Sequence, residues 1–358
     1  MTKVREFNNV PRGCHLRVED LFCCPVCKSS LIHDSDYFQC NFCGGRFFKK
    51  GEVYDFRIKG DLWDVKKSEK LVSSLLTSPH STWFSNLFQK FPAKQYIHLM
   101  NDPRLEEIDT YMNKLNKGGI NIGQRYDKEI LAEGSLRDLH ELAITMRYVP
   151  DTKSKKVALD IGCGTLRGTK RLLLKNYERI VAIDLLPELM LHGYGKLGEK
   201  ERERVILVKA DVRFLPLKDD VADLAISLEL FEHIDCPLLM LMDVRRVLKD
   251  DGVAVFNTWH ALLPGNRRNI LRKGKSYYEN GFFYIFYEAP DIKKILNAVD
   301  VGYVIRPCGC ALGRRLLSVL GENVGKLFLR PLVVVDNLLS FFLPRFLFPF
   351  LVFILRKR

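Results

Sequence analysis

Residues 157–168 read Val-Ala-Leu-Asp-Ile-Gly-Cys-Gly-Thr-Leu-Arg-Gly, and this stretch decides the fold. The apolar run around Asp160 predicts a buried strand, and a helix is predicted to follow over residues 169–176. Gly162 and Gly164 lie in the turn between them, where the lack of a side chain lets the backbone approach a ligand closely. The stretch therefore predicts a strand–turn–helix unit that binds a small molecule.

Asp160 indicates which ligand this turn accepts. A carboxylate two residues before the first glycine disfavours a dinucleotide, because it would face the pyrophosphate that a helix N-terminus attracts. The turn also departs from the G-x-G-x-x-G pattern, since Arg167 holds the last position and Gly168 comes one residue later. A ligand with positive charge and no phosphate fits better. S-adenosylmethionine (SAM), with its sulfonium and ammonium groups, is such a ligand.

The chain after this unit continues as an alternation of apolar runs and helical stretches. Asp184 ends the first run, about 20 residues past the glycines, where an acid can accept hydrogen bonds from ribose hydroxyls. Short apolar runs that alternate with helices predict βαβ units and a parallel sheet covered on both faces. The four runs are residues 179–184, 205–210, 222–228 and 253–259, with a helix predicted over residues 237–248 before the last.

Five segments occur in one order between residues 155 and 259: "LDIGCG", "VAID", "KADVRFLPLKDD", "ISLELFEHI" and "VRRVLKDDGVAVFNTW". This order resembles the class I SAM-dependent methyltransferases, in particular the subgroup like ubiquinone and menaquinone C-methyltransferases (methyltransferase type 11). The resemblance implies an α/β fold with a Rossmann-like sheet of seven strands and helices on both faces. It implies a SAM-dependent methyltransferase domain over residues 151–358, whose antiparallel seventh strand is residues 350–355.

The resemblance also implies positions for the cofactor. Residues of the glycine turn lie near the methionine part of SAM, Asp184 lies at the ribose, and Asp211 lies at the adenine amino group. Leu166 departs from the family, because many members have a third glycine at this position. The implied cofactor-binding residues are Asp160, Gly162, Cys163, Gly164, Asp184, Leu185, Asp211, Val212 and Leu228.

A second site is predicted near the N-terminus, in residues 18–58. Cys24 and Cys27 form one C-x-x-C pair. Cys40 and Cys43 form a second pair, separated from the first by twelve residues. Two such pairs deliver four thiolates to one tetrahedral Zn²⁺, which leaves no open position for chemistry, so the zinc would be structural. A redox pair is the alternative. The segment resembles the small zinc-ribbon subunit that activates tRNA, rRNA and release-factor methyltransferases, and we expect the methyltransferase core to fold without it.

Residues 61–150 are predicted to form a helical connector that packs on the core and partly covers the cofactor cleft as a lid. Its last helix is expected over residues 136–148. Tyr111, Tyr126 and His140 are candidates to face the substrate, although residues of these types are more often simply packed or exposed. His233 follows the fourth predicted strand, where it is either a general base or a structural residue; the structural role is favoured.

Composition and charge indicate a cytoplasmic protein with a basic C-terminal part. The chain has 358 residues and a net charge of +13, and its ten cysteines include two matched pairs, which favours a reducing compartment. The first twenty residues contain no apolar run of signal-peptide length. Residues 261–358 carry sixteen Lys and Arg against six Asp and Glu and are rich in Phe and Leu. Such a segment suits an anionic membrane surface, so a peripheral membrane location is an additional expectation.

The C-terminal tail allows two interpretations. Residues 337–355 are long enough to cross a membrane, but Arg345 lies at the centre, and Pro344 and Pro349 interrupt a helix. The favoured alternative is a helix over residues 335–343 followed by the strand at 350–355. Basic residues before it, Arg314, Arg315, Lys326 and Arg330, would then be available to a membrane surface.

Three functions compete at this point. The first is a methyltransferase that acts on an O, N or C nucleophile of a small or lipid-like molecule. The second is an RNA or translation-factor methyltransferase that uses the zinc ribbon to bind its substrate. The chain has Ser227-Leu-Glu-Leu230 where such enzymes carry an Asn-Pro-Pro-Tyr motif, which weakens this second hypothesis. The third, a SAM-binding regulator without catalysis, is disfavoured by the intact acids Asp160, Asp184 and Asp211.

Overall fold

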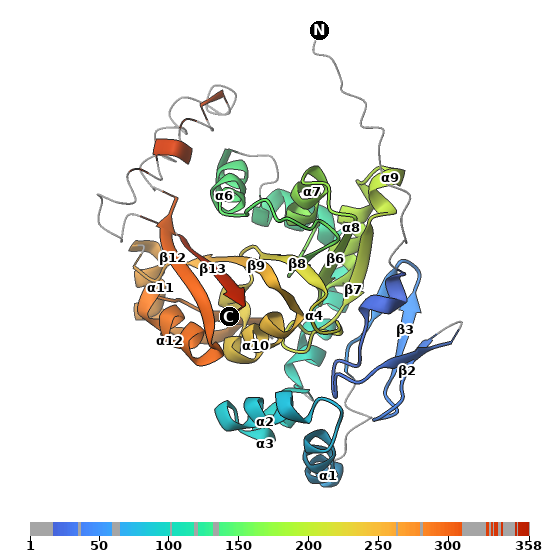
Figure 1. Cartoon of the computed structure of the whole chain (residues 1–358). Coiled ribbons are helices and arrows are strands. Elements are labelled where there is room, and N and C mark those ends of the chain that lie inside the picture. Colours follow the sequence, from blue (N-terminus) through green and yellow to red (C-terminus); the bar gives the residue numbers. More distant parts are fainter. Residues whose placement is uncertain are drawn as a thin grey trace.

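The computed structural model describes most of the chain (Figure 1). The described residues are 17–34, 37–58, 65–100, 102–117, 121–131, 136–262, 264–279, 282–309 and 350–357, with a few isolated residues between 327 and 348. Central to this structure is one large twisted sheet with helices on both sides.

Seven strands form the core of the sheet and confirm the predicted Rossmann-like architecture. Five neighbours run parallel in the order β7-β6-β5-β8-β9, and β13 lies antiparallel between β9 and β12. All residues of β5 and β8 are buried, which explains why these strands read as continuous apolar runs rather than alternating ones. The strands are β5 (Val157–Ile161), β6 (Arg179–Asp184), β7 (Val205–Lys209), β8 (Ala222–Ser227), β9 (Leu248–Trp259), β12 (Val301–Cys308) and β13 (Phe350–Lys357).

The sheet is larger than the seven strands expected, and this corrects the prediction. Four strands of the N-terminal segment continue it, because β4 pairs parallel with β7, and eleven strands form one sheet within the described residues. The amide of Phe56 adds a hydrogen bond to the Lys209 carbonyl (2.8 Å). Strand β7 would otherwise be an edge with unpaired backbone groups, which β4 satisfies. The added strands are β1 (Leu31–His33), β2 (Tyr37–Cys40), β3 (Arg46–Lys50) and β4 (Val53–Asp55).

Helices cover both faces of the sheet, as predicted. On one face α6 (Leu136–Met146), α7 (Arg167–Leu174) and α8 (Pro187–Gly195) pack against side chains such as those of Ile180 and Ile226. On the other face lie α10 (Pro237–Val247) and α12 (Ala289–Val299), together with three connector helices. These are α1 (Val65–Leu76), α2 (Ser81–Lys90) and α3 (Ala93–Met100), which Figure 1 shows below the sheet.

The remaining elements surround the carboxyl ends of the parallel strands or connect the larger helices. Helix α4 leads through the short α5 and the π-helical turn η3 to α6 and β5. After β9, α11 precedes the β10–β11 hairpin, whose two strands pair with each other. The bounds are η1 (Val18–Leu21), α4 (Arg104–Lys117), α5 (Ile122–Arg125), η3 (Tyr126–Leu131), α9 (Glu199–Arg202), η4 (Phe231–His233), α11 (Pro264–Lys273), β10 (Ser276–Glu279) and β11 (Phe282–Ile285).

The N-terminal ribbon (residues 18–58) is joined to the core by buried contacts as well as by the sheet. Lys28, which directly follows the first cysteine pair, places its ammonium group 2.7 Å from Asp243 of α10, and both side chains are fully buried. Its Nζ also donates to the Leu215 carbonyl (3.2 Å). The phenol of Tyr96 on α3 donates to the Val26 carbonyl of the ribbon (3.0 Å). Ribbon, connector and core share one hydrophobic cluster, and these contacts argue against the expectation that the core folds without the ribbon, which stays a prediction to be tested.

The C-terminal tail ends as a sheet strand. Strand β13 pairs with β9 on one side and β12 on the other, which confirms the strand predicted at residues 350–355. Among the described residues, no helix combines the length and the apolar character that a membrane crossing requires. The helix expected over residues 335–343 and the basic residues Arg314, Arg315, Lys326 and Arg330 lie largely outside the described part of the chain.

Candidate functional site

The glycine turn between β5 and α7 is tied to the end of β6. The amides of Gly162 and Cys163 both donate to the Ile183 carbonyl, at 2.8 and 3.1 Å. Gly162 (φ +73°) and Gly164 (φ +48°) adopt the left-handed conformation, which residues with a side chain disfavour. Leu166, where the third glycine was missing, is also left-handed (φ +65°) at the N-cap of α7. The turn thus keeps its geometry at a conformational cost of about 1–2 kcal/mol at Leu166.

Asp160 lies beneath the first turn of α7. Its carboxylate is buried and accepts a hydrogen bond from the Thr169 hydroxyl (2.7 Å). A side chain on Gly168 would meet both carboxylate oxygens at 2.9 Å, so only glycine lets the helix approach this acid. Burial raises the pKa of Asp160 to about 6, although the Thr169 hydrogen bonds act in the opposite direction. Sequence reasoning noted Gly168 as a departure from a pattern but missed this role.

Asp184 joins the end of β6 to the glycine turn. One carboxylate oxygen accepts from the Gly164 amide (2.8 Å), and the other accepts from the Leu186 amide (3.0 Å). Burial raises the pKa of Asp184, and the amides of Gly164, Leu186 and Leu185 oppose that shift. The ring of Tyr126, from η3, lies 3.7 Å from the position that a Cβ on Gly164 would take. Asp184, Leu185 and the turn are therefore brought together, with Tyr126 against them.

The segment after β8 closes against the other side of the turn. A Cβ on Gly162 would lie only 2.6 Å from the Leu230 side chain. Glu229 is left-handed (φ +55°), its amide donates to the Asn257 side chain (2.6 Å), and its carboxylate meets Arg167 of α7 (3.2 Å). Leu228, predicted to line the cofactor site, is buried immediately before these residues. Leu230 and Glu229 were not singled out, because nothing in their spacing predicts a contact with the turn.

Asp211, at the end of β7, lies in a buried ionic cluster. The Arg213 guanidinium binds both of its carboxylate oxygens (2.6 and 3.0 Å) and also reaches Asp102 (3.1 Å) and Asp235 (2.8 Å). Arg104 completes the cluster through Asp102 (2.5 Å) and Asp235 (2.6 Å). Burial would raise the pKa of Asp102, but the two guanidinium groups hold it below its ordinary value. Val212, beside Asp211, is buried.

This cluster was missed from the sequence except for Asp211. Arg213 follows Asp211 by two residues, which is a local signal that could have been used. Asp102, Arg104 and Asp235 come from the start of α4 and from the loop after η4, and only the fold brings these segments to the end of β7.

The other sequence candidates make packing contacts. His233 is packed under the β10–β11 hairpin, where its Nδ1–H donates to the Phe283 carbonyl (2.9 Å) and its ring meets Tyr284 edge to face. Burial lowers the pKa of His233, which keeps the imidazole neutral. Tyr111 packs against Phe282, and His140 is fully buried in α6. These contacts are those of packed residues.

The four predicted metal ligands, Cys24, Cys27, Cys40 and Cys43, form one cluster. Their sulfur atoms all lie within 4.8 Å of one another, with Cys24 to Cys43 at 3.6 Å and Cys27 to Cys40 at 3.3 Å. Zn–S bonds of about 2.3 Å in a tetrahedron imply sulfur separations of about 3.8 Å, so the cluster fits such an ion. The Cys40 sulfur also accepts from the amides of Phe42 and Cys43 (both 3.4 Å), which suits a thiolate ligand.

Comparison with known proteins identifies the domain around the glycine turn. The family model described as a methyltransferase domain (type 11) matches residues 159–256, so the chain contains a methyltransferase domain. An uncharacterized protein of Methanocaldococcus jannaschii is 32% identical over 141 residues, which cover 38% of this chain and 51% of that protein. The malonyl-[acyl-carrier protein] O-methyltransferase of Geobacter sulfurreducens is 35% identical over 101 residues, which cover 27% of this chain and 36% of that enzyme.

Solved methyltransferase structures also resemble the chain, at low identity. One is phosphoethanolamine N-methyltransferase 2 of Haemonchus contortus in complex with phosphomonomethylethanolamine and S-adenosylhomocysteine. It has a TM-score of 0.43 and 16% identity, and the match covers 61% of this chain and 52% of that one. The chain thus spans about half the length of the first curated and structural relatives, at 51% and 52%.

Proposed function

We propose that the chain is a SAM-dependent methyltransferase whose cofactor binds at the glycine turn. The observation that carries this proposal is the turn itself, which lies within the matched methyltransferase domain and is held to Asp184 through the Gly164 amide. SAM would supply an electrophilic methyl group on sulfur, and the acceptor would attack it in line. The chain's own part is to hold both partners in near-attack geometry, which can contribute about 7–11 kcal/mol.

The cofactor-binding residues are proposed as the sequence predicts them. Asp184 would accept hydrogen bonds from the ribose, since this half-buried residue ends β6 beside the glycine turn. Asp211 would lie at the adenine, and its bidentate contact with Arg213 fixes the orientation of the carboxylate. Asp160 would support the cofactor site indirectly, because its contacts with Thr169 and Gly168 hold the start of α7 beside the turn.

The proposed acceptor is a small or lipid-like molecule with an O, N or C nucleophile. The resemblance to ubiquinone-type C-methyltransferases supports this class. The malonyl-[acyl-carrier protein] O-methyltransferases among the relatives support it as well, as does the basic, Phe- and Leu-rich composition of residues 261–358.

A peripheral location on anionic membranes within the cytoplasm is part of this proposal. Release of the protein from anionic vesicles by high salt or carbonate is the expected result; resistance to carbonate would contradict it.

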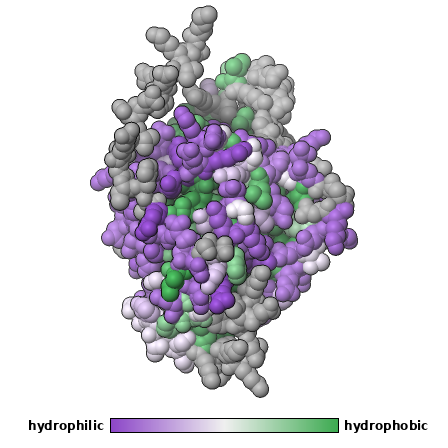
Figure 2. All heavy atoms as spheres, turned by 90° about the vertical axis from the view of Figure 1, so that its right-hand side faces the viewer, coloured by the Kyte–Doolittle hydropathy of each residue, from purple (hydrophilic) through white to green (hydrophobic). Residues whose placement is uncertain are grey.

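An RNA or translation-factor substrate is the second candidate, and one surface of the ribbon favours it. Arg46, Phe48 and Lys50 alternate along β3 and all are exposed, so they share one face of the strand. Phe42 is 39% exposed and Phe48 is 46% exposed. Aromatic rings interspersed with cations are what single-stranded RNA stacks on. Elsewhere the described residues on the ribbon side of the molecule are largely hydrophilic, with small separate hydrophobic areas (Figure 2).

The proposed role of the four-cysteine cluster is to bind one structural Zn²⁺. Four protein thiolates fill a tetrahedral site, so the ion would hold the ribbon together and would take no part in methyl transfer. Metal analysis of the purified protein should give about one zinc per chain. A full complement of zinc in the doubly substituted Cys24→Ser, Cys40→Ser protein would rule out this ligand set.

The decisive experiment separates cofactor binding from the choice of acceptor. Calorimetry should show binding of SAM and none of NAD; binding of NAD would contradict the proposal. Transfer of a labelled methyl group from SAM is then measured with lipid and metabolite extracts and, separately, with RNA and ribosomal fractions. Label in the first pool supports the small-molecule proposal. Label in RNA or protein, with binding that weakens steeply as salt rises, would establish the second candidate. SAM binding without transfer to any pool would indicate a SAM-binding regulator.

A further inference from the structure

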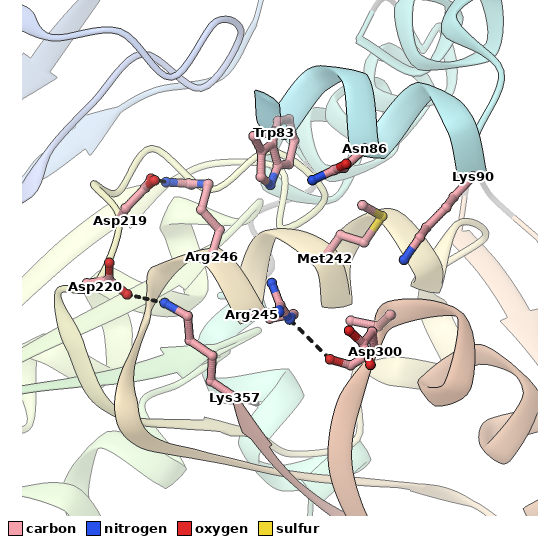
Figure 3. Close-up of a pocket in the computed structure, with 11 residues that line it drawn as sticks. Trp83, Asn86, Lys90, Asp219, Asp220, Met242, Arg245, Arg246, Asp300 and Lys357 are labelled. Carbon is pink, nitrogen blue, oxygen red and sulfur yellow. Dashed lines mark hydrogen bonds and ion pairs between the residues drawn. The ribbon is translucent and has the colours of Figure 1, made fainter. Parts of the chain in front are cut away.

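A pocket of about 390 Å³ lies at the edge of the sheet opposite the glycine turn. Asp219 and Asp220, which line it, precede the amino end of β8, whereas the turn follows the carboxyl end of β5. Strands β5 and β8 are parallel neighbours, so the two sites lie at opposite ends of them. Figure 3 shows that side chains from α2, α10 and the end of β13 converge on the pocket. Its volume falls within the range of small-molecule sites, about 300–1,000 Å³.

One side of the pocket is electrically neutralised. Arg246 contacts Asp219 (2.6 Å) while its Nε binds the buried Asp243 (2.6 Å), and Lys357 pairs with Asp220. These contacts pair two of the three acids that line the pocket; the third, Asp300, lies on the other side. The lining residues carry four cations, Lys90, Arg245, Arg246 and Lys357, against these three acids, so the charge of the lining is net positive.

The opposite side carries two cations without a carboxylate partner among the described residues. Lys90 of α2 donates to the Ala298 carbonyl (2.8 Å), and Arg245 of α10 donates through Nε to the Asp300 carbonyl (3.2 Å). Both carbonyls lie at the C-terminal end of α12. A lysine has three donors and an arginine has five, so most N–H groups of these two side chains stay available. In Figure 3 both cationic groups lie on the side of Asp300.

Three of the lining residues are apolar or aromatic. Met242 and Val299 are buried, and the Trp83 indole of α2 has the Arg246 guanidinium 6.0 Å from its ring centroid. A pocket that is lined by cations together with aromatic and aliphatic side chains suits a ligand with an oxyanion on an apolar body. A guanidinium binds carboxylate and phosphate through parallel hydrogen bonds, and the lysine adds a point charge.

We infer that this pocket is a second ligand site, which binds a small oxyanion carried on an aromatic or aliphatic body between Lys90, Arg245 and Trp83. The site bridges α2 of the connector and α10 and α12 of the core. A bound ligand therefore ties the connector to the core and raises the stability of their joint, without contact to the proposed cofactor residues.

Titration calorimetry with four probes tests the chemistry of the site. Phenyl phosphate and phenylacetate represent the two oxyanions, inorganic phosphate lacks the apolar body, and phenol lacks the charge. At least one aromatic oxyanion should bind about tenfold or more tightly than inorganic phosphate, and phenol should not bind. The better of the two oxyanions identifies the head group. Saturating SAM should leave the affinity unchanged, and the four probes test the pocket whether or not SAM binds.

Variants locate the binding. The double substitution Lys90→Gln, Arg245→Gln should weaken binding by at least about tenfold, because it removes both charge-assisted contacts to the oxyanion. The matched control is Lys94→Gln, Arg267→Gln, whose side chains are exposed and do not line the pocket; its affinity should equal that of the parent.

Should the double variant be unstable, the parent protein still decides the question through the Trp83 indole N–H resonance, assigned with Trp83→Phe. This resonance should move on titration while that of Trp259 stays. No binding by the parent protein, or equal loss in the control, overturns the inference.

Discussion

Asp184 is the residue on which the proposed cofactor site depends most directly. Its two carboxylate oxygens accept hydrogen bonds from the amides of Gly164 and Leu186, so it supports the glycine turn. This role in the local fold is separate from the role proposed for it at the ribose.

Replacement of this acid should weaken SAM binding. In Asp184→Ala we expect a loss of roughly 1.5–3 kcal/mol of binding free energy, the range for a hydrogen bond that involves a charged group. The melting temperature should also fall, because the Gly164 amide loses its acceptor. Calorimetry and thermal unfolding measure both effects, and Asp251→Ala, at an exposed position, is the control. An unchanged SAM affinity would remove Asp184 from the cofactor site.

A second residue, Glu232, predicts how stability depends on pH. This acid is buried; one oxygen accepts from the Thr258 hydroxyl (3.0 Å), and the other has no hydrogen-bond partner among the described residues. Burial, with the nearby charge of Glu229, raises its pKa to about 8. Between its unfolded pKa of about 4.3 and this value the folded state binds a proton that the unfolded state does not, so stability falls as pH rises, by up to about 1.4 kcal/mol per unit.

The variant Glu232→Gln should remove this dependence. Denaturant unfolding is measured at pH 6 and at pH 8, and the parent should lose more stability between them than the variant does. Glu199→Gln, on the surface helix α9, should behave as the parent. Equal slopes in parent and Glu232→Gln proteins would show that Glu232 titrates normally.

The structure shows which parts of the site a sequence can reveal. Gly162 and Gly164 follow the end of β5, and Asp184 ends β6. The carboxyl ends of neighbouring parallel strands meet at one edge of a sheet, so their proximity was predictable once β5 and β6 were taken as neighbours. Arg213 reaches Asp102 across 111 residues of sequence, and no local pattern encodes that distance. Asp160 was identified, but its contact with Gly168 depends on how closely α7 packs.

At the level of elements, strand β13 is the clearest test of the C-terminal tail. Phe353 is fully buried at its centre, stacked on Phe256 (5.3 Å between ring centroids) and edge to face with Phe231 (4.8 Å). Phe353→Ala should therefore lower the free energy of unfolding by about 3–5 kcal/mol. The exposed Arg356 lies on the same strand, and Arg356→Ala is the control, with an expected change within about 0.5 kcal/mol. Were the tail a membrane anchor, Phe353→Ala would leave the melting temperature unaltered.

Most core elements were predictable because their patterns are local. Strand β6 was predicted with the bounds it has, and β8 within one residue, since buried parallel strands produce continuous apolar runs. Strand β9 begins at Leu248, ahead of the predicted residue 253, because Leu248 pairs with Ala222 across an irregularity in the ladder. The pairing of β4 with β7 was not predictable, since an edge strand of three residues carries no sign of its partner.

For the whole molecule, the decisive feature is the union of ribbon and core. Removal of the Lys28 side chain breaks a fully buried ion pair between them, and such a loss costs about 3–5 kcal/mol. Lys28→Ala should thus lower the melting temperature of the entire chain. Lys94→Ala, at an exposed position of α3, should not. A variant in which the ribbon alone loosens, with hydrogen exchange at β7 unchanged, would show that the two parts are independent.

Removal of the proposed metal ion should also destabilise the entire chain. A chelator that strips the four-cysteine cluster should unfold ribbon and core in one transition at lower temperature, because β4 completes the sheet edge at β7 and metal-binding energy is folding energy. Scanning calorimetry with and without chelator measures this. Two separate transitions, with the second at the parent temperature, would contradict it.

The pairing of β4 with β7 also bears on the order in which a ribosome delivers the chain. Strand β4 emerges roughly 150 residues before its partner, a delay of about 8–30 s at 5–20 residues per second. During that interval the β4 edge and the Lys28 ammonium face solvent without the groups that later cover them. All four cysteines of the two C-x-x-C pairs have emerged by then. A metal ion would therefore bind to them before β7 is available and would keep the nascent ribbon compact. Cells short of zinc during translation should accordingly accumulate aggregated chain, while zinc supplied after synthesis should rescue little of it.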